Sequence, residues 1–266
     1  MYIRYPIVAG TFYPANPQEL EKMVRGFLHQ ATVEKFSIQP KALIVPHAGY
    51  VYSGPVAAYG FKALENQNYK KIILLGPSHH FSFQGLTSSP SGYWETPLGK
   101  IECLGKENFK ELKKTKEIIE SSEIHEPEHC LEVEIPFLQT VLKEFKIVSF
   151  LTGELNIKTI AKVLEHLVDE GTLILVSSDL SHYYSYEEAQ KLDTVTIDAI
   201  LDNDSKRLEE YGEACGKTGI DILLEIAKNK HWQPKLLKAS NSGDTAGDKS
   251  QVVGYASIVF FDYDSN

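Results

Sequence analysis

The feature that most constrains this chain is a pattern that occurs three times, in which a short apolar run ends in a loop carrying histidine. The first run ends at His47, the second at His79 and His80, and the third at Asp179 and His182. Runs rich in leucine and β-branched residues are typical of buried strands in a parallel sheet. Because ligands in open α/β sheets bind beyond the carboxyl ends of such strands, the pattern predicts one convergent site.

The size and charge of the chain narrow its class. Its 266 residues are enough for one large α/β domain or two small ones, with most of the apolar surface buried. The formal charge is −9, from 27 basic and 36 acidic residues, whereas nucleic-acid binding requires a basic face. No apolar run approaches the roughly 20 residues of a membrane span, and the first residues lack the apolar core of a signal peptide. We therefore expect a cytoplasmic protein with neither nucleic acid nor a membrane as partner, and of undetermined oligomeric state.

Helical and extended patterns alternate along the chain. Asn16, Pro17 and Glu19 mark a helix start, with asparagine as the N-cap and proline in the first turn. Strands are predicted over residues 42–45, 72–75, 147–151, 173–177 and 251–261, and helices over 55–64, 107–117, from 132, and over 157–170, 186–201, 205–211 and 219–229. This alternation predicts an α/β/α sandwich with a mixed, largely parallel central sheet. Without a linker or repeat, residues 1–266 are expected to form a single domain, with a hairpin-rich excursion over residues 81–128.

His47 and His79 follow two consecutive predicted strands. Histidine is the commonest metal ligand in proteins, and it also caps strand ends by ordinary hydrogen bonding. Two histidines on successive strand ends, with a third beyond another strand, favour a metal site. His80 adjoins His79, and neighbours in an extended loop point in opposite directions, so His80 is expected to support the site or the fold instead of facing the same centre.

Asp179 and His182 lie three residues apart after the third strand. A carboxylate at this spacing can orient the imidazole, or act beside it in acid–base catalysis. Alternatively, Asp179 caps the coming helix and leaves His182 exposed. The sequence leaves both interpretations open.

Cys215 lies in residues 212–219, a segment that resembles a phosphate-binding loop but has one residue too few between its glycines. We therefore exclude nucleotide binding there. Lys217 nearby could favour the thiolate, which is the form that ligates metal or attacks a substrate, whereas a lone cysteine often serves only as a small buried residue. With Cys103 and Cys130 it makes an odd, widely spaced set, so no disulfide framework is predicted.

Three further residues are expected around the site. His129 is expected at its mouth, while Glu132 begins a helix and could satisfy the helix dipole. Tyr50 is one of several aromatic residues that could stack on a ligand, although core packing explains most aromatics. Residues 241–247 are expected to form a flexible loop that could cover a pocket. The remaining histidines are expected on the surface: His29, His125, His166 and His231.

The chain resembles the Memo family, whose prokaryotic members are also called AmmeMemoRadiSam system protein B. The matching motifs lie in order over nearly the whole chain, at residues 9–14, 46–50, 76–80, 128–132, 177–182 and 215–216. The resemblance implies a fold shared with class III extradiol dioxygenases, which are non-heme iron enzymes. It implies metal-ligand roles for His47, His79 and Cys215, with Asp179 and His182 beside them. The dioxygenases have a carboxylate where this chain has Cys215, and a thiolate shifts the preference toward copper(I), zinc or a differently tuned iron.

Three functions follow as hypotheses. The first is a metal-dependent redox or oxygen-related protein that holds one iron or copper ion, with zinc as a further option. In it, His182 is oriented by Asp179 and serves as acid, base or gate at the open coordination position. The second is a hydrolase or transferase with Cys215 as the nucleophile. The third is a binding module that holds a small molecule or a peptide in the cleft between His47 and His79 without turnover.

Overall fold

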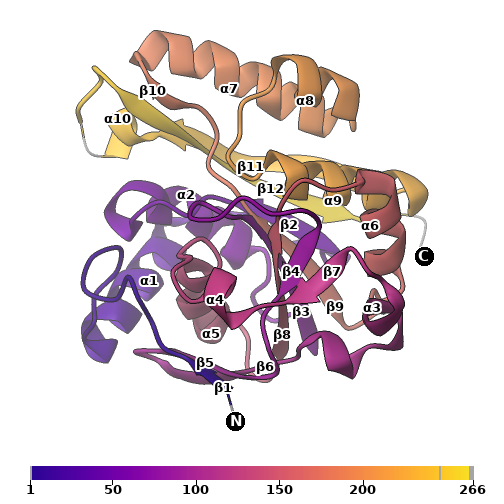
Figure 1. Ribbon diagram of the computed structural model, residues 1–266. Helices are drawn as coiled ribbons and strands as arrows, with labels where there is room; N and C mark the ends of the chain where they lie inside the picture. Colours follow the sequence, from indigo (N-terminus) through magenta and orange to yellow (C-terminus); the bar gives the residue numbers. More distant parts are fainter. Residues whose placement is uncertain (1, 246, 264–266) are drawn as a thin grey trace.

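The computed structural model describes residues 2–245 and 247–263, which form one large sheet with helices on both faces (Figure 1). The strands are β1 (Tyr2–Arg4), β2 (Ala42–Val45), β3 (Lys71–Pro77), β4 (Leu86–Ser88), β5 (Gly92–Thr96), β6 (Gly99–Cys103), β7 (Ile118–Glu120), β8 (Lys146–Thr152), β9 (Thr172–Ser177), β10 (His182–Tyr184), β11 (Gln233–Asn241) and β12 (Val252–Phe261). Their order across the sheet is β1-β5-β6-β8-β3-β9-β2-β12-β10, with β4 beside β8, β7 beside β4 and β11 beside β12.

The centre of the sheet is parallel and its margins are mixed. β8, β3, β9 and β2 are parallel neighbours, whereas β12 runs antiparallel to β2 and β4 runs antiparallel to β8. The predicted α/β/α sandwich with a mixed, largely parallel sheet is therefore confirmed. Since the parallel strands all end at one edge, the loops that follow β2, β3 and β9 lie at the same side of the molecule.

The helices form two layers. α1, α2 and α5 cover one face of the sheet, and α6 and α9 cover the other (Figure 1). α7 lies over β11 and β12, and α8 packs between α7 and α9. Shorter helical segments lie between them. The bounds are α1 (Pro17–Gln30), α2 (Tyr50–Lys62), η1 (Lys106–Asn108), α3 (Lys110–Lys114), α4 (Ser122–His125), η2 (Glu132–Glu134), α5 (Ile135–Val141), α6 (Ile157–Glu165), α7 (Tyr186–Leu201), α8 (Ser205–Tyr211), α9 (Lys217–Asn229) and α10 (Ser242–Thr245).

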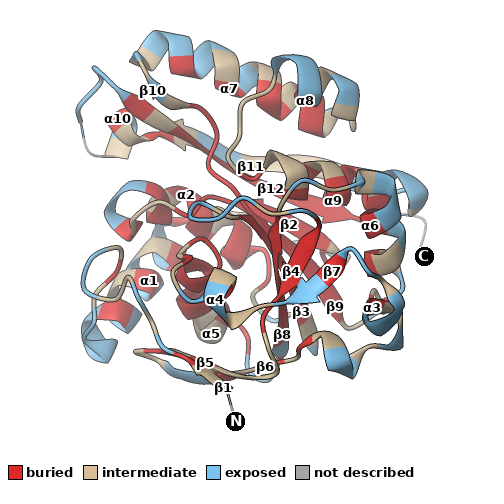
Figure 2. Cartoon of the chain, viewed as in Figure 1, coloured by how far each residue is buried: buried red, intermediate tan, exposed pale blue. Residues whose placement is uncertain are grey.

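The central strands feed two hydrophobic cores. In β3, Ile72 and Leu74 pack with α1 and α2, while Ile73 and Leu75 pack with α6 and α9 on the opposite face. The alternation follows from the two-residue period of a strand. Figure 2 shows that the central strands are buried. Because both faces are covered, the strand ends are held on a rigid frame.

The predicted start of α1 is confirmed. Asn16 caps the helix, and its side chain accepts hydrogen bonds from the N–H groups of Gln18 and Glu19 at 3.0 and 3.1 Å. We expect Asn16→Ala to lower the free energy of unfolding by about 1 kcal/mol, because those two amides lose their acceptor. Urea unfolding measures the change. Gln18→Ala, in the same exposed turn, serves as the control, and an equal loss there would contradict the capping role.

Three predicted helix boundaries are wrong. α2 begins at Tyr50 and contains Pro55, so the proline lies within the helix and does not open it. Proline lacks the N–H that would bond the carbonyl of Val51, and Val51 lies on the exposed side, where water can replace that bond. The helix predicted over residues 107–117 is divided into η1 and α3, and the one predicted to reach residue 170 ends at Glu165.

One margin of the sheet agrees with expectation and the other does not. The excursion over residues 81–128 contains the expected hairpin, β5 and β6, and its strands extend the sheet next to β8. β11 was not predicted, because this edge strand is polar and lacks a clear alternation. The supposed flexible loop over residues 241–247 contains the end of β11 and α10, while residue 246 lies outside the described residues.

No helix in the described part of the chain is long and apolar enough to cross a membrane.

Candidate metal centre

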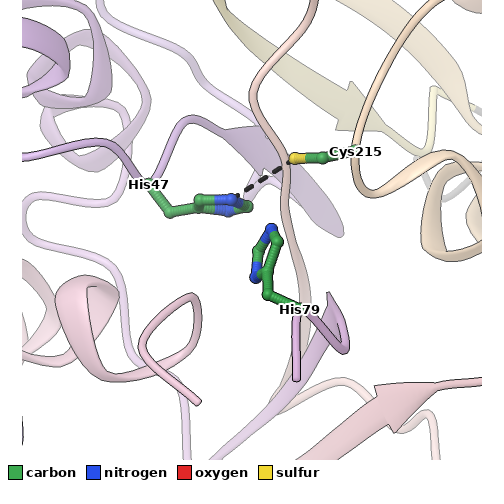
Figure 3. Close-up of side chains that lie close together, drawn as sticks. All are labelled: His47, His79 and Cys215. Atoms are coloured by element: carbon green, nitrogen blue, oxygen red, sulfur yellow. Dashed lines mark hydrogen bonds between the residues drawn. The ribbon is translucent and has the colours of Figure 1, made fainter. Parts of the chain in front are cut away.

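Three side chains converge beyond the carboxyl ends of the central strands. His47 follows β2, His79 follows β3, and Cys215 comes from the loop before α9. The atoms that each could offer to a metal ion lie within 4.8 Å of one another. Figure 3 shows the two imidazole rings and the sulfur directed toward one point. His47 is buried, Cys215 is half-buried and His79 is exposed, so this His47–His79–Cys215 cluster is open on one side.

The spacing of the cluster fits one transition-metal ion. Cys215 Sγ lies 3.3 Å from His47 Nε2. A tetrahedral ion with bonds of about 2.0 Å to nitrogen and 2.3 Å to sulfur places those two atoms about 3.5 Å apart. Two imidazoles and one thiol form a donor set suited to copper, zinc or iron, and they leave a coordination position for a further ligand. The residues present therefore fit the group that the resemblance implies.

His79 is held by a carboxylate. Its Nδ1 lies 2.9 Å from Glu128 Oε1, and its backbone N–H donates to Glu128 Oε2 at 2.6 Å. The hydrogen bond with Glu128 raises the pKa of His79. Burial alone would raise the pKa of Glu128, but the hydrogen bonds it accepts hold that pKa well below its usual range. With Nδ1 engaged, the Nε2 atom of His79 is directed into the cluster, which is the arrangement of carboxylate–histidine–metal sites.

His47 is held by a hydroxyl group. Its Nδ1 lies 2.8 Å from the Oγ atom of Ser177 at the end of β9. Both residues are buried, and burial lowers the pKa of His47 well below its usual value. The ring is therefore neutral near pH 7, and neutral imidazole is the form that binds metal.

The position of Cys215 depends on a close approach between the backbone of its own loop and the end of β9. A Cβ at Gly216 would lie 2.6 Å from Ser178 Cβ and 2.7 Å from Ser177 O, so only glycine lets this loop reach the end of β9. Cys215 Sγ then accepts the N–H of Asp179 at 3.2 Å. Burial, with a smaller contribution from the charge of Asp179, raises the pKa of the Cys215 thiol to about 12.

The expectation that Lys217 favours the thiolate is wrong. The ammonium group of Lys217 donates to the carbonyls of Glu209 and Gly212 at 2.7 and 3.3 Å, and the thiol stays protonated near pH 7. Lys217 lies at the start of α9, and its side chain turns back to α8 and the loop behind it. Sequence proximity alone did not indicate this direction. A cation at the cluster is what would convert Cys215 to a thiolate.

Asp179 has a different partner from the one expected. Its carboxylate accepts the backbone N–H of His47 at 2.8 Å, and burial raises its pKa to about 7. Among the described residues no hydrogen bond joins Asp179 to His182, so the predicted orientation of His182 by Asp179 is wrong. The capping alternative is wrong as well, because β10 follows and the next helix begins only at Tyr186. Asp179 instead ties the loop after β2 to the loop after β9.

His182 nevertheless stands beside the cluster. It pairs with Val253 in the sheet and is half-buried. Burial lowers its pKa, and a charge on His182 would in turn lower the pKa of His47. The next residue, Tyr183, is exposed and has a left-handed backbone (φ 65°), which is strained for an aromatic residue. His182 is thus a neutral imidazole within electrostatic reach of the cluster.

His129 and His80 differ in their relation to the centre. His129 stacks on His79 with ring centroids 4.8 Å apart, and its Nδ1 lies 3.3 Å from Glu128 Oε1. A second set of three donors, formed by His79, Glu128 and His129, therefore adjoins the first. Glu128 already accepts the backbone N–H groups of His79, His129 and Cys130, which favours a hydrogen-bonding role for it. His80 is exposed and belongs to neither set.

Two expected pocket residues belong to the core. Glu132 is fully buried and pairs with Arg4, and Tyr50 donates its hydroxyl hydrogen to Val133 O at 2.6 Å. The ring of Tyr50 packs against Phe137. Neither side chain faces the cluster. Their closeness to site motifs in the sequence does not bring either side chain to the cluster.

Sequence analysis missed the groups that hold the ligands. Glu128 and Ser177 lie within motifs of the family resemblance, but nothing in the sequence indicates which side chains they contact, and Glu134 stands out in no motif. His125, expected on the surface, is fully buried, and its Nε2 lies 3.1 Å from Thr87 O. Contacts of this kind join residues tens of positions apart, so spacing in the sequence does not indicate them.

Comparison with known proteins places the chain among well-matched relatives. The family model described as Memo-like protein matches residues 4–259. A MEMO1 family protein of Thermoplasma volcanium is 38% identical over 267 residues, which cover 97% of this chain and 98% of the relative. MEMO1 family proteins of Nitrosopumilus maritimus and Thermotoga neapolitana are 35% and 36% identical, each over 97% of this chain and 99% of the relative. The matched range includes positions 47, 79 and 215 and nearly all of the fold.

Proposed function

This chain belongs to the Memo family, and on that premise we propose that it binds one transition-metal ion through His47, His79 and Cys215. The observation that carries the proposal is the convergence of two imidazoles and a thiol whose outer contacts are already made. Each histidine has its Nδ1 engaged, one with Glu128 and the other with Ser177, which leaves Nε2 for the ion. Iron and copper are the proposed ions, with zinc as a further option.

The residues around the cluster suit redox or oxygen-related chemistry. A bound iron or copper ion would supply the electron transfer or the activation of a small molecule that the protein side chains cannot provide. His182, neutral and beside the cluster, can take up a proton there. Asp179 keeps the loop that carries His47 fixed against the loop that follows β9. A redox role of this kind, in an extradiol-dioxygenase-like fold, is the proposed function.

The partner we propose is a small molecule. A cavity of about 540 Å³ opens beside Cys215, between the loop after β3 and the start of α9. Polar and aromatic side chains line it, among them Ser78, Phe81, Thr152 and Thr218. The three cysteines are free thiols, and we propose a cytoplasmic location, where reducing conditions keep them so.

The cysteine-nucleophile alternative has less support. A nucleophilic cysteine requires a depressed pKa, and burial instead raises the pKa of Cys215 to about 12. A bound metal ion would stabilise the thiolate of such a buried cysteine, and this favours a ligand role for Cys215. Rapid alkylation of Cys215 in metal-free protein at neutral pH would reverse this preference.

Elemental analysis of protein purified without air tests the proposal. We expect about one iron or copper ion per chain, lost in His79→Ala and in Cys215→Ala, because removing one ligand of such a site weakens binding by roughly 100-fold or more. His166→Ala and Cys103→Ala are the matched controls, since His166 is an exposed histidine and Cys103 a buried cysteine outside the cluster. Folded wild-type protein that contains no metal and takes none up would overturn the proposal and favour the non-catalytic binding cleft.

A further inference from the structure

Behind the metal centre, one buried hydroxyl group has three hydrogen-bonding neighbours. Ser177 Oγ lies 2.8 Å from His47 Nδ1, 2.8 Å from the carbonyl oxygen of Cys130 and 2.7 Å from Glu134 Oε1. All four residues are buried, with exposed fractions of 2% or less. No element of the proposed function uses Glu134 or the Cys130 carbonyl.

The hydrogen atoms at this point can be counted. A serine hydroxyl has one hydrogen to donate and two lone pairs that accept. The Cys130 carbonyl has no hydrogen, so its 2.8 Å contact is a hydrogen bond only if Ser177 donates to it. Burial raises the pKa of the Glu134 carboxyl group well above its usual value, so this group can carry a proton and donate it to Ser177. With its one hydrogen given to Cys130, Ser177 has none left for the ring of His47. The close contact at Nδ1 is then a hydrogen bond only if Nδ1 carries the hydrogen and donates it to Ser177.

We propose that Ser177, steered by Glu134 and the Cys130 carbonyl, is a positioning residue that locks His47 in the tautomer with its hydrogen on Nδ1. This inference rests on the proposed metal site, since the lock leaves the Nε2 lone pair free for the ion. Nε2 is the nitrogen that lies 3.3 Å from Cys215 Sγ. The two histidines of the cluster are thus oriented by different means, His79 by the carboxylate of Glu128 and His47 by a buried hydroxyl.

Glu134 contributes to the lock through its position. It is fully buried at the start of α5, and its one hydrogen-bonding partner among the described side chains is Ser177. A carboxyl group in such a place costs folding free energy, because burial of a polar group is unfavourable unless it is bonded. The bond to Ser177 satisfies this carboxyl group beside the apolar first turn of α5. A proton that Glu134 donates occupies one lone pair of Ser177, which leaves the other for the N–H of His47 and the Ser177 hydrogen for the Cys130 carbonyl.

The first test measures the tautomer directly in the metal-free protein. Two-bond proton–nitrogen NMR of ¹⁵N-histidine-labelled protein, stripped with a chelator, distinguishes a ring protonated at Nδ1 from one protonated at Nε2. His47→Gln identifies the signals of His47. We expect the wild type to carry the hydrogen on Nδ1 and Ser177→Ala to show a mixture or the Nε2 form. A wild-type His47 protonated at Nε2 would overturn the inference, whether or not the protein binds metal.

The second test measures zinc affinity by competition with a chelator. We expect Ser177→Ala to bind zinc about 10–100-fold more weakly than the wild type, the usual cost of losing an outer partner of a ligating histidine. Ser257→Ala is the matched control, because Ser257 is also fully buried and donates to a backbone carbonyl, that of Val56, at 2.7 Å. It should stay within about threefold of the wild type. Equal affinities for wild type and Ser177→Ala would overturn the positioning role, whereas wild-type protein that binds no zinc, iron or copper would overturn the proposed function and leave the NMR result to decide the tautomer.

Discussion

Replacing Arg4 by methionine is expected to lower the free energy of unfolding by about 3–5 kcal/mol, the largest effect on stability that we predict for a single residue. Arg4 is 1% exposed, and its Nη1 lies 2.7 Å from Glu132 Oε2. Its other nitrogens donate to the carbonyls of His125 and Glu128, and its guanidinium group lies 4.3 Å from the ring centroid of Trp94. Without it, the Glu132 carboxylate remains buried with no cation beside it.

Replacing Arg4 should also disturb the metal centre. Glu132 accepts the N–H groups of Ile7 and Val8 and the hydroxyl hydrogen of Tyr13, so it ties the N-terminal segment to η2. Arg4 bonds the backbone of Glu128, whose side chain holds His79. A weakened N-terminal segment would therefore disturb the orientation of a proposed ligand.

Urea unfolding of three variants tests this prediction. Arg25→Met is the matched control, because Arg25 pairs with Glu21 on the surface, with side chains 61% and 49% exposed, and such a pair contributes only about 0.3–0.5 kcal/mol. The double variant Arg4→Met/Glu132→Gln should recover part of the loss, since it removes the stranded charge. A change below about 1 kcal/mol for Arg4→Met would show that the buried pair does not stabilise the fold.

The affinity for metal is expected to rise steeply with pH. The pKa of Cys215 is raised to about 12, so at neutral pH the ion must displace the thiol proton, and affinity should increase about tenfold per pH unit. The pKa of His79 is raised too, so at the acidic end a second proton competes and the slope becomes steeper. His47 contributes little, because its pKa is lowered and the ring is already neutral. Between about pH 6.5 and 8.5 the total change should be at least about 100-fold.

Chelator competition across this pH range measures the slope, and proton release in weak buffer counts the protons displaced per ion. In Cys215→Ala, the affinity that remains should depend less on pH, by about one tenfold step per pH unit, since no thiol proton is displaced. In His79→Ala, the affinity should rise by about tenfold per pH unit over the whole range, including its acidic end. A pH-independent affinity in the wild type would mean that Cys215 is not a ligand, even if the protein contains metal.

Much of the fold was predictable because local patterns and global packing agree. The central strands are short apolar runs that must be buried on both faces, and α1 carries its own cap at Asn16. The misjudged elements are those whose local signal is weak or ambiguous. β11 is a polar edge strand that becomes recognisable only when β12 lies beside it. Proline is common in the first turn of a helix, whereas Pro55 lies inside α2.

For the candidate site, His47 and His79 were predictable because parallel strands bring their carboxyl ends to one edge, whatever the details of packing. Cys215 was selected by the family resemblance, and no local pattern distinguished it from a buried structural cysteine. The hydrogen-bonding partners of the supporting residues could not be predicted from the sequence. Asp179 bonds the backbone of His47 across 132 positions, and Ser177 bonds Glu134 across 43.

The sequence by itself thus determined the sheet, the edge at which a ligand would bind and the types of donor atom available there. These depend on short-range properties: the period of apolar residues, the preference of each residue for a strand or helix, and the chemistry of imidazole and thiol. Only the tertiary structure decided which donors meet, which nitrogen of each ring faces inward, and how far burial shifts the pKa of Cys215. Those properties depend on distances of a few ångströms between segments that are remote in the chain, and on the exclusion of water, neither of which exists before the chain has folded.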